Sequence, residues 1–407
     1  MRQRSLAPLR LPAYRRLFSA YSVNNLGDWV GEIALSVLVL HATDSVLAVT
    51  ALWVLGRFVP ALLAPLTVSA VERRLGATKP LRGLHLIEAG LFGLVAAAAA
   101  AGAPVVLILG LALVDGIVSS TARALLKTAV VATTRPHELL REGNALLGVA
   151  FTVTVATGPL LGGAVVALLG IPAALILDAV SFAFAALVLG PGARLPAVAR
   201  DDAEATDRLR AGFAHLWRHR ELRVLTLADA AAGVFFAAII PVELVLVTQT
   251  LGGTEADFGA VLAAWGIGAV LGSGAVSVFP RIGPRTLLLA GVGLCIAGYL
   301  GMGTAAAVAA VVTWSFVGGI GNGLEGVVLT TFIQERTPDA LQARINAVVE
   351  ALHTGAPGLG FLLGGVVAAT ASPRAAYWFA GVGALVVTAI AVAALLRPAP
   401  RATPVYA

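Results

Sequence analysis

The chain has 407 residues, of which 58% are hydrophobic and only 12% are charged. A soluble domain averages about 25% charged residues, so this chain has too few polar side chains to cover a water-facing surface. The hydrophobic residues fall in long runs, each sufficient to cross about 30 Å of hydrocarbon. Because backbone groups in lipid must be paired within their own segment, these runs are predicted to be helices.

We therefore predict an all-α polytopic membrane protein with twelve transmembrane helices. The basic N-terminal segment lacks the short apolar core and cleavage site of a signal peptide, so the first run should be a retained helix. The predicted spans are 17–40, 46–71, 84–102, 104–132, 144–169, 172–190, 222–249, 258–279, 286–303, 306–333, 345–370 and 375–396.

Lysine and arginine residues are concentrated in alternate loops. One set of loops, counted with both termini, holds 24 of them, and the other set holds only Arg374. The positive-inside rule then predicts that both termini and the long central loop are cytoplasmic. The net charge of +6 therefore belongs to one membrane face, and nucleic acid is not an expected partner. The arginine-rich, lysine-poor composition suggests a bacterial chain in the cell (inner) membrane.

The sequence also repeats itself after a shift of 202 residues. The matched positions include Pro136 with Pro338, Gly158 with Gly360, and 160–163 with 362–365. Six spans separate the copies, which predicts two six-helix bundles in the same orientation, with the substrate site between them near the membrane midplane. The expected divisions are a first bundle at 1–190, a polar cytoplasmic linker at 191–221 and a second bundle at 222–407.

Four segments resemble signatures of the drug- and siderophore-exporter branch of the major facilitator superfamily, which includes enterobactin-exporter-like and macrolide-efflux-like proteins. They are Leu26–Trp29, Thr121–Arg123, Leu177–Phe182 and Ile333–Asp339. The resemblance covers nearly the whole chain and implies the major facilitator fold. It also implies a small-molecule substrate and contact with membrane lipid, and we expect the chain to act as a monomer. None of the four segments indicates which substrate is transported.

The fifth predicted span carries Gly158, Pro159, Gly162 and Gly163, which resemble the core of the antiporter motif of exporters. Pro159 removes a backbone donor and bends the helix, and the glycines allow another helix to approach closely. The motif favours export, although ordinary packing of small residues would also explain it.

Two loops retain parts of the superfamily's loop motif. The retained residues are Arg74 and Gly76 in the first half and Arg281, Gly283 and Arg285 in the second. The glycines permit tight turns and the cations hold the loops at an anionic leaflet. The alternative is that these cations are simply membrane anchors.

Ionisable residues inside spans are costly unless they are paired or hydrated. Asp28 and Glu32 lie one turn apart in the first span, and Arg57 lies at comparable depth in the second. An ion pair between Arg57 and one of these acids would leave the other free to carry a coupling proton. The competing interpretation is a fixed structural network.

The shift of 202 residues places Arg123 on Glu325, so opposite charges occupy related positions in the two halves. We predict that these two residues, or Glu350 and His353 beside them, help to close the cytoplasmic side; local pairing within each half is the alternative. Further candidates for the substrate path are Asp115 and Trp29, the latter as part of an aromatic wall.

The sequence therefore predicts a secondary transporter that exports an amphipathic small molecule, by proton antiport and alternating access. The sequence has no nucleotide-binding loop, no nucleophile–base pattern and no metal-ligand spacing, so we expect no enzyme activity, no cofactor and no bound metal. An importer, a lipid flippase or a non-transporting membrane sensor remains an alternative.

Overall fold

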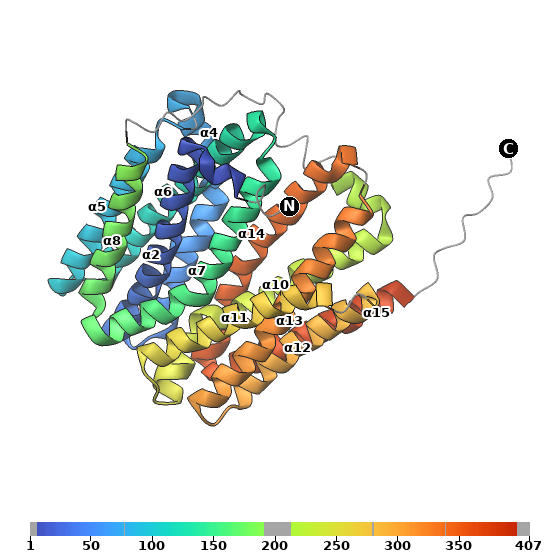
Figure 1. The fold of residues 1–407 in the computed structure, drawn as a ribbon. Coiled ribbons are helices and arrows are strands. Elements are labelled where there is room, and N and C mark those ends of the chain that lie inside the picture. The colour runs from blue at the N-terminus through green and yellow to red at the C-terminus, as the bar shows by residue number, and fades with distance from the viewer. Residues whose placement is uncertain (1–5, 77, 191–212, 279–280, 338, 397–407) are drawn as a thin grey trace.

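The computed structural model describes residues 6–76, 78–190, 213–278, 281–337 and 339–396. Within these ranges it contains twelve helices long and apolar enough to cross a membrane, and no strand. The predicted all-α polytopic fold is therefore confirmed (Figure 1).

The helices follow the order that the hydrophobic runs predict. The first six spans are α2 (Pro12–Thr43), α3 (Val46–Trp53) continued by η2 (Val54–Phe58) and α4 (Val59–Leu75), α5 (Leu81–Ala100), α6 (Val105–Thr134), α7 (Leu140–Leu169) and α8 (Ile171–Val188). The last six are α10 (Arg220–Val245) continued by η4 (Leu246–Thr250), α11 (Glu255–Val278), α12 (Pro284–Thr304), α13 (Val308–Glu335), α14 (Asp339–Thr370) and α15 (Pro373–Leu396). Two 3-10 turns, η1 (Ala7–Arg10) and η3 (Arg135–His137), flank α2 and α6.

Several helices extend past the predicted spans at one end. α2 starts at Pro12 rather than at residue 17, and α14 starts at Asp339 rather than at 345. Hydropathy detects only the apolar part of a helix, whereas the backbone continues its hydrogen bonding into the polar segment beside it. Pro12 also favours the first position of a helix, where its missing N–H is not needed.

The two ends of the helix bundle differ in charge. We call one end the basic end, because the α4–α5 and α6–α7 connections and the start of α12 meet there. It carries Arg73, Arg74, Lys79, Arg135, Arg141, Arg281 and Arg285. The opposite end holds the connections α2–α3, α7–α8, η4–α11 and α14–α15.

Each set of six helices packs mainly within itself. In the first set, α8 lies against α2 and α5, and α7 lies against α2. In the last set, α13 lies against α11 and α12, while α10 lies against α14 and α15. The two sets meet chiefly where α7 crosses α11 and where α14 crosses α3 and η2. Figure 1 shows the sets crossing near the opposite end and leaning apart toward the end that carries α4.

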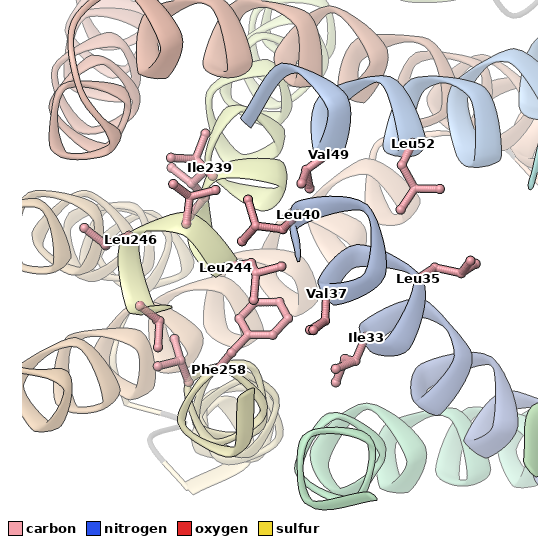
Figure 2. Close-up of a cluster of buried hydrophobic side chains, with 14 of the residues drawn as sticks. Ile33, Leu35, Val37, Leu40, Val49, Leu52, Ile239, Leu244, Leu246 and Phe258 are labelled. Atoms are coloured by element: carbon pink, nitrogen blue, oxygen red, sulfur yellow. The ribbon is translucent and has the colours of Figure 1, made fainter. Parts of the chain in front are cut away.

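A cluster of buried hydrophobic side chains closes the opposite end. Leu40 of α2 and Val49 of α3 lie in this cluster with Leu244 of α10 and Phe258 of α11 (Figure 2). Two polar contacts join the sets near the cluster. His41 lies 3.3 Å from Glu255, and the Gln249 amide donates a hydrogen bond to Asp44.

Glycines allow the crossing helices to approach at this end. A Cβ on Gly163 of α7 would lie 2.6 Å from the carbonyl oxygen of Glu255 and 3.1 Å from the Cα of Gly259, both in α11. Gly365 of α14 packs against the side chain of Thr50 in α3. The structure is therefore closed at the opposite end.

Most of the predicted linker, residues 191–212, lies outside the described residues. Residues 213–218 are helical, with Leu216 buried and Trp217 exposed. The proposed division into two bundles joined by a linker stays a prediction.

Candidate functional site

A cavity of about 650 Å³ lies between the two sets of helices. Its wall comes from α2, α3, η2 and α7 on one side and from α10, α11, α13 and α14 on the other. The aromatic residues of the wall are Trp29, Trp53, Phe151, Phe236, Phe258, Trp265 and Phe361. Trp53 and Phe361 meet across the seam with ring centroids 5.7 Å apart. The volume is in the range of sites that bind drug-sized molecules.

One ion pair lies in the wall of this cavity. The Arg57 guanidinium donates two hydrogen bonds to the Glu32 carboxylate, one of them from Nε to Oε1 at 3.1 Å. Arg57 belongs to η2, a π-helical segment inside the second span, and such segments are frequent at functional sites. The pair that we expected between Arg57 and one of the two acids is thus present, and its acid is Glu32.

The other acid, Asp28, is not left without a cation. Nη1 of Arg123 lies 3.5 Å from its Oδ2, and the Asn24 amide donates to its Oδ1 at 3.2 Å. The expectation of one unpaired acid in the first span is therefore wrong in this conformation. The reason is that α6 packs against α2, which places Arg123 beside Asp28.

A smaller buried pocket of about 70 Å³ lies within the first six helices. Its ionisable lining residues are Asp28, Glu32, Asp115, Asp178, Arg57 and Arg123. Four carboxyl groups thus face two guanidinium groups. One oxygen each of Asp115 and Asp178 is buried without a hydrogen-bond partner in the described part of the chain. The pocket therefore holds two more carboxyl groups than guanidinium groups.

Asp178 joins two of the family-like segments. Its side chain is fully buried and accepts a hydrogen bond from Ser181 at 3.1 Å. It packs against Gly27 and Gly31 of α2, where a Cβ on Gly27 would lie 2.7 Å from its Oδ1. The Leu26–Trp29 and Leu177–Phe182 segments are therefore one packing interaction between α2 and α8.

The last six helices hold acids near the corresponding positions, since the shift of 202 residues places Arg123 on Glu325, and Asp229 lies next to Ala230, the counterpart of Asp28. Asp229 and Glu325 line an apolar pocket of about 260 Å³. His353 lies 2.5 Å from Asp229, and the Cys295 thiol donates to Glu325 at 3.8 Å. Where the first set pairs an acid with Arg123, the last set places a second acid.

Arg123 and Glu325 do not meet in this structure, since Arg123 pairs locally with Asp28. The helices lean apart at the basic end, so a role of these residues in closing that end stays a prediction. Glu350 lies in α14, but its side chain is outside the described residues.

The family described as "Transmembrane secretion effector" matches residues 3–403. The chain belongs to this family. No curated protein matches the sequence.

Solved transporters share the fold of this secretion effector family member at low sequence identity. The nucleoside transporter NupG has a TM-score of 0.69 and 13% identity, with 95% of this chain and 100% of that chain covered. An inward-facing bacterial homologue of the iron transporter ferroportin has a TM-score of 0.65 and 17% identity, with 95% and 99% covered. A bacterial homologue of the lysosomal transporter Spinster has 0.70 and 13%, with 95% and 97% covered. These likenesses show the major facilitator fold, and together with the family match they identify the chain as a transmembrane transporter.

The glycine–proline motif of this secretion effector family member lies at helix crossings. Gly158 packs against Trp29 of α2, and Gly162 lies against Ile33 of the same helix. The carbonyl of Pro159 and the backbone of Gly163 face Gly259 of α11. The motif therefore borders both the cavity wall and the seam between the two sets of helices.

The two loop motifs differ from each other in backbone conformation. Gly76 ends α4 with a φ of +79°, a value that favours glycine. Gly283 has a φ of −62° at the start of α12, so no positive φ requires a glycine there. Arg74 and Arg281 are exposed, and Arg285 pairs with Glu221 at 3.2 Å.

Glu243 is an acid of the seventh predicted span whose side the sequence left open, and the structure places it in the cavity wall. It is buried, with 5% of the residue's surface exposed, and it lines the central cavity from α10. The signal was an acid two residues after Pro241 within the apolar run 222–249. Its orientation depends on the rotation of α10 about its axis, which the sequence alone does not set.

Proposed function

We propose that the protein is a proton-coupled exporter of an amphipathic small molecule that works by alternating access. The observation that carries this proposal is the Glu32–Arg57 ion pair, which lines both the central cavity and the acid-rich buried pocket. Ser36 and Trp53 line both spaces as well. A proton taken up in the pocket would therefore change the charge balance at the wall of the cavity.

The proposed cycle rocks the two sets of six helices about the cavity. The basic end is the cytoplasmic end in this proposal, following the positive-inside rule. The structure then corresponds to the cytoplasm-open state, because the apolar cluster around Leu40 and Phe258 closes the opposite end. In the other state the basic end would close and this cluster would separate.

Asp28 is the better of the two candidates for the coupling proton. Glu32 is held by two hydrogen bonds from Arg57, whereas Asp28 has one long contact of 3.5 Å with a cation, Arg123, and one hydrogen bond from the neutral Asn24 amide. A weakly held carboxylate exchanges its cation for a proton more readily. Protonation of Asp28 would release Arg123. This residue lies on α6, the helix that runs to the basic end.

Two observations support transport out of the cell: the motif at the seam between the two sets of helices, and the description of the family. The glycine–proline motif at Gly158–Gly163 borders α11 and resembles that of exporters, and the family is described as one of secretion. We accordingly place the protein with siderophore- and macrolide-type exporters of a bacterial plasma membrane, acting as a monomer.

Proton flux in proteoliposomes tests this proposal. The purified protein is reconstituted with a pH-sensitive dye inside, and amphipathic probes of positive, zero and negative charge are added in turn. We expect at least one probe to drive proton movement that empty liposomes do not show. No proton flux with any probe, from protein that remains folded, would contradict the coupling.

The same assay separates the two candidate acids. Asp28→Asn should abolish proton-coupled flux while leaving probe exchange across the membrane, and Glu32→Gln should retain part of the flux. If both variants keep full pH-gradient-driven transport, neither residue carries the coupling proton.

A further inference from the structure

Glu243 stands out among the charged residues of the central cavity. Only 5% of the residue's surface is exposed, and it lines the cavity wall next to Leu244, which Figure 2 shows in the apolar cluster. In the described part of the chain its carboxylate has neither an ion pair nor a side-chain hydrogen bond. A buried carboxylate is costly without a compensating charge or donor.

The rest of the cavity wall does not supply that charge. Its only other charged residues among those described are Glu32 and Arg57, which neutralise each other. The wall therefore carries one uncompensated acidic group. The remaining lining residues are apolar, aromatic or neutral polar.

The aromatic rings of the wall add to the preference for positive charge. Phe236 and Trp265 lie side by side with ring centroids 5.3 Å apart, and both line the cavity together with Glu243. The faces of aromatic rings attract cations through their quadrupoles, by about 0.5–2 kcal/mol per contact. The same rings provide a flat apolar surface for a hydrophobic body.

We infer that the cargo of the central cavity is a monovalent organic cation with an aromatic or other apolar body, and that Glu243 is its counter-charge. This inference rests on the proposed function, since it names the class of substrate for the same cavity. A single positive charge matches the single unpaired acid, and the apolar body matches the aromatic wall. A permanent anion of the same shape would meet the Glu243 carboxylate without compensation.

Two ions of matched shape provide the test. Tetraphenylphosphonium and tetraphenylborate have nearly the same size and surface but opposite charge. Equilibrium dialysis of each ion against the purified full-length protein in detergent measures binding without requiring transport. We expect tetraphenylphosphonium to bind at least about tenfold more tightly than tetraphenylborate, after subtraction of binding to empty micelles.

Three variants connect this preference to Glu243. Glu243→Gln should weaken tetraphenylphosphonium binding about tenfold and reduce the difference between the two ions. Glu243→Asp should restore most of the cation binding because it keeps the charge. Glu335→Gln removes the same charge from an exposed position at the end of α13 and should leave binding unchanged.

Two results would overturn the inference. One is equal binding of both ions to the unmodified protein. The other is unchanged tetraphenylphosphonium affinity in Glu243→Gln with a normal melting curve, which would mean that the carboxyl group is neutral and holds its own proton.

The cargo class and the proposed transport can be rejected separately by these two tests. Glu243-dependent cation binding without proton flux for any probe would leave the cargo class standing and reject the proposed transport. Conversely, proton-coupled movement of neutral or anionic probes alone would support transport and reject the cationic cargo.

Discussion

Arg57 lines the central cavity and also forms an ion pair with the Glu32 carboxylate. The Arg57 side chain is 41% exposed, whereas the Glu32 side chain is only 15% exposed. Removing the cation would thus leave a largely buried carboxylate without its partner. An unpaired buried charge of this kind is more damaging than the loss of the pair as a whole.

Arg57→Gln should therefore destabilise the protein by about 1–2 kcal/mol, less than a fully buried pair would lose, because Arg57 is partly exposed. Apparent melting temperature in detergent measures the change. The double variant Arg57→Gln with Glu32→Gln should recover most of the loss, since it removes the orphan charge. A double variant no more stable than Arg57→Gln alone would show that the pair's electrostatics are not the cause.

At the residue scale, the sequence predicted which side chains are ionisable but not which of them meet. The spacing of Asp28 and Glu32 placed both acids on one face of α2. Arg57 pairs with Glu32, and Arg123 pairs with Asp28. Both pairings depend on the rotation of η2 and on the packing of α6 against α2. These are tertiary features, and an alignment of hydrophobic runs does not contain them.

The helix crossings of the seam are set by small residues. The α7–α11 crossing brings Gly163 and Gly259 so close that a Cβ added to either would lie 3.1 Å from the Cα of the other. The sequence predicted a role for the glycine–proline motif in close packing and left its partner open. The partner is α11, which comes from the other set of six helices. The π-helical segments η2 and η4 had no recognisable signal in the hydropathy pattern.

A side chain at Gly163 should prevent this crossing. Gly163→Val would place carbon atoms against the Glu255 carbonyl, which the helix backbone does not allow to move away. We expect the variant to open the opposite end and to lose transport. Labelling of a cysteine introduced at Leu40 by a membrane-impermeant maleimide, in a Cys295→Ala background, should become faster.

Gly148→Ala is the matched control, because it lies on the same helix with nothing within 4 Å of the added Cβ. It should leave both labelling and transport unchanged. Slow labelling of the Leu40 cysteine in Gly163→Val would argue against this crossing as the seal of the opposite end.

The whole molecule combines a cavity between two sets of helices with closure at only one end. The number and order of the spans, and the position of the cavity near their middle, follow from the hydrophobic runs and the internal repeat. The conformational state does not follow from the sequence, because the same helices must pack in at least two arrangements for transport. In this structure the apolar cluster of Figure 2 holds the helices together at the end opposite the basic end.

The central claim is that the two sets of helices move against each other about the cavity. Paired spin labels measure this most directly by distance distributions in lipid nanodiscs. One pair, at Leu75 and Ile282, spans the exposed loops of the basic end, and the other, at Thr43 and Ala306, spans the opposite end. Cys295→Ala supplies the background without native thiols.

When pH is lowered or tetraphenylphosphonium is added, we predict opposite changes in the two distances. The Leu75–Ile282 distance should shorten while the Thr43–Ala306 distance lengthens, and Asp28→Asn should suppress the response to pH. Two distances that stay fixed under every condition, or that lengthen together, would contradict alternating access in this protein.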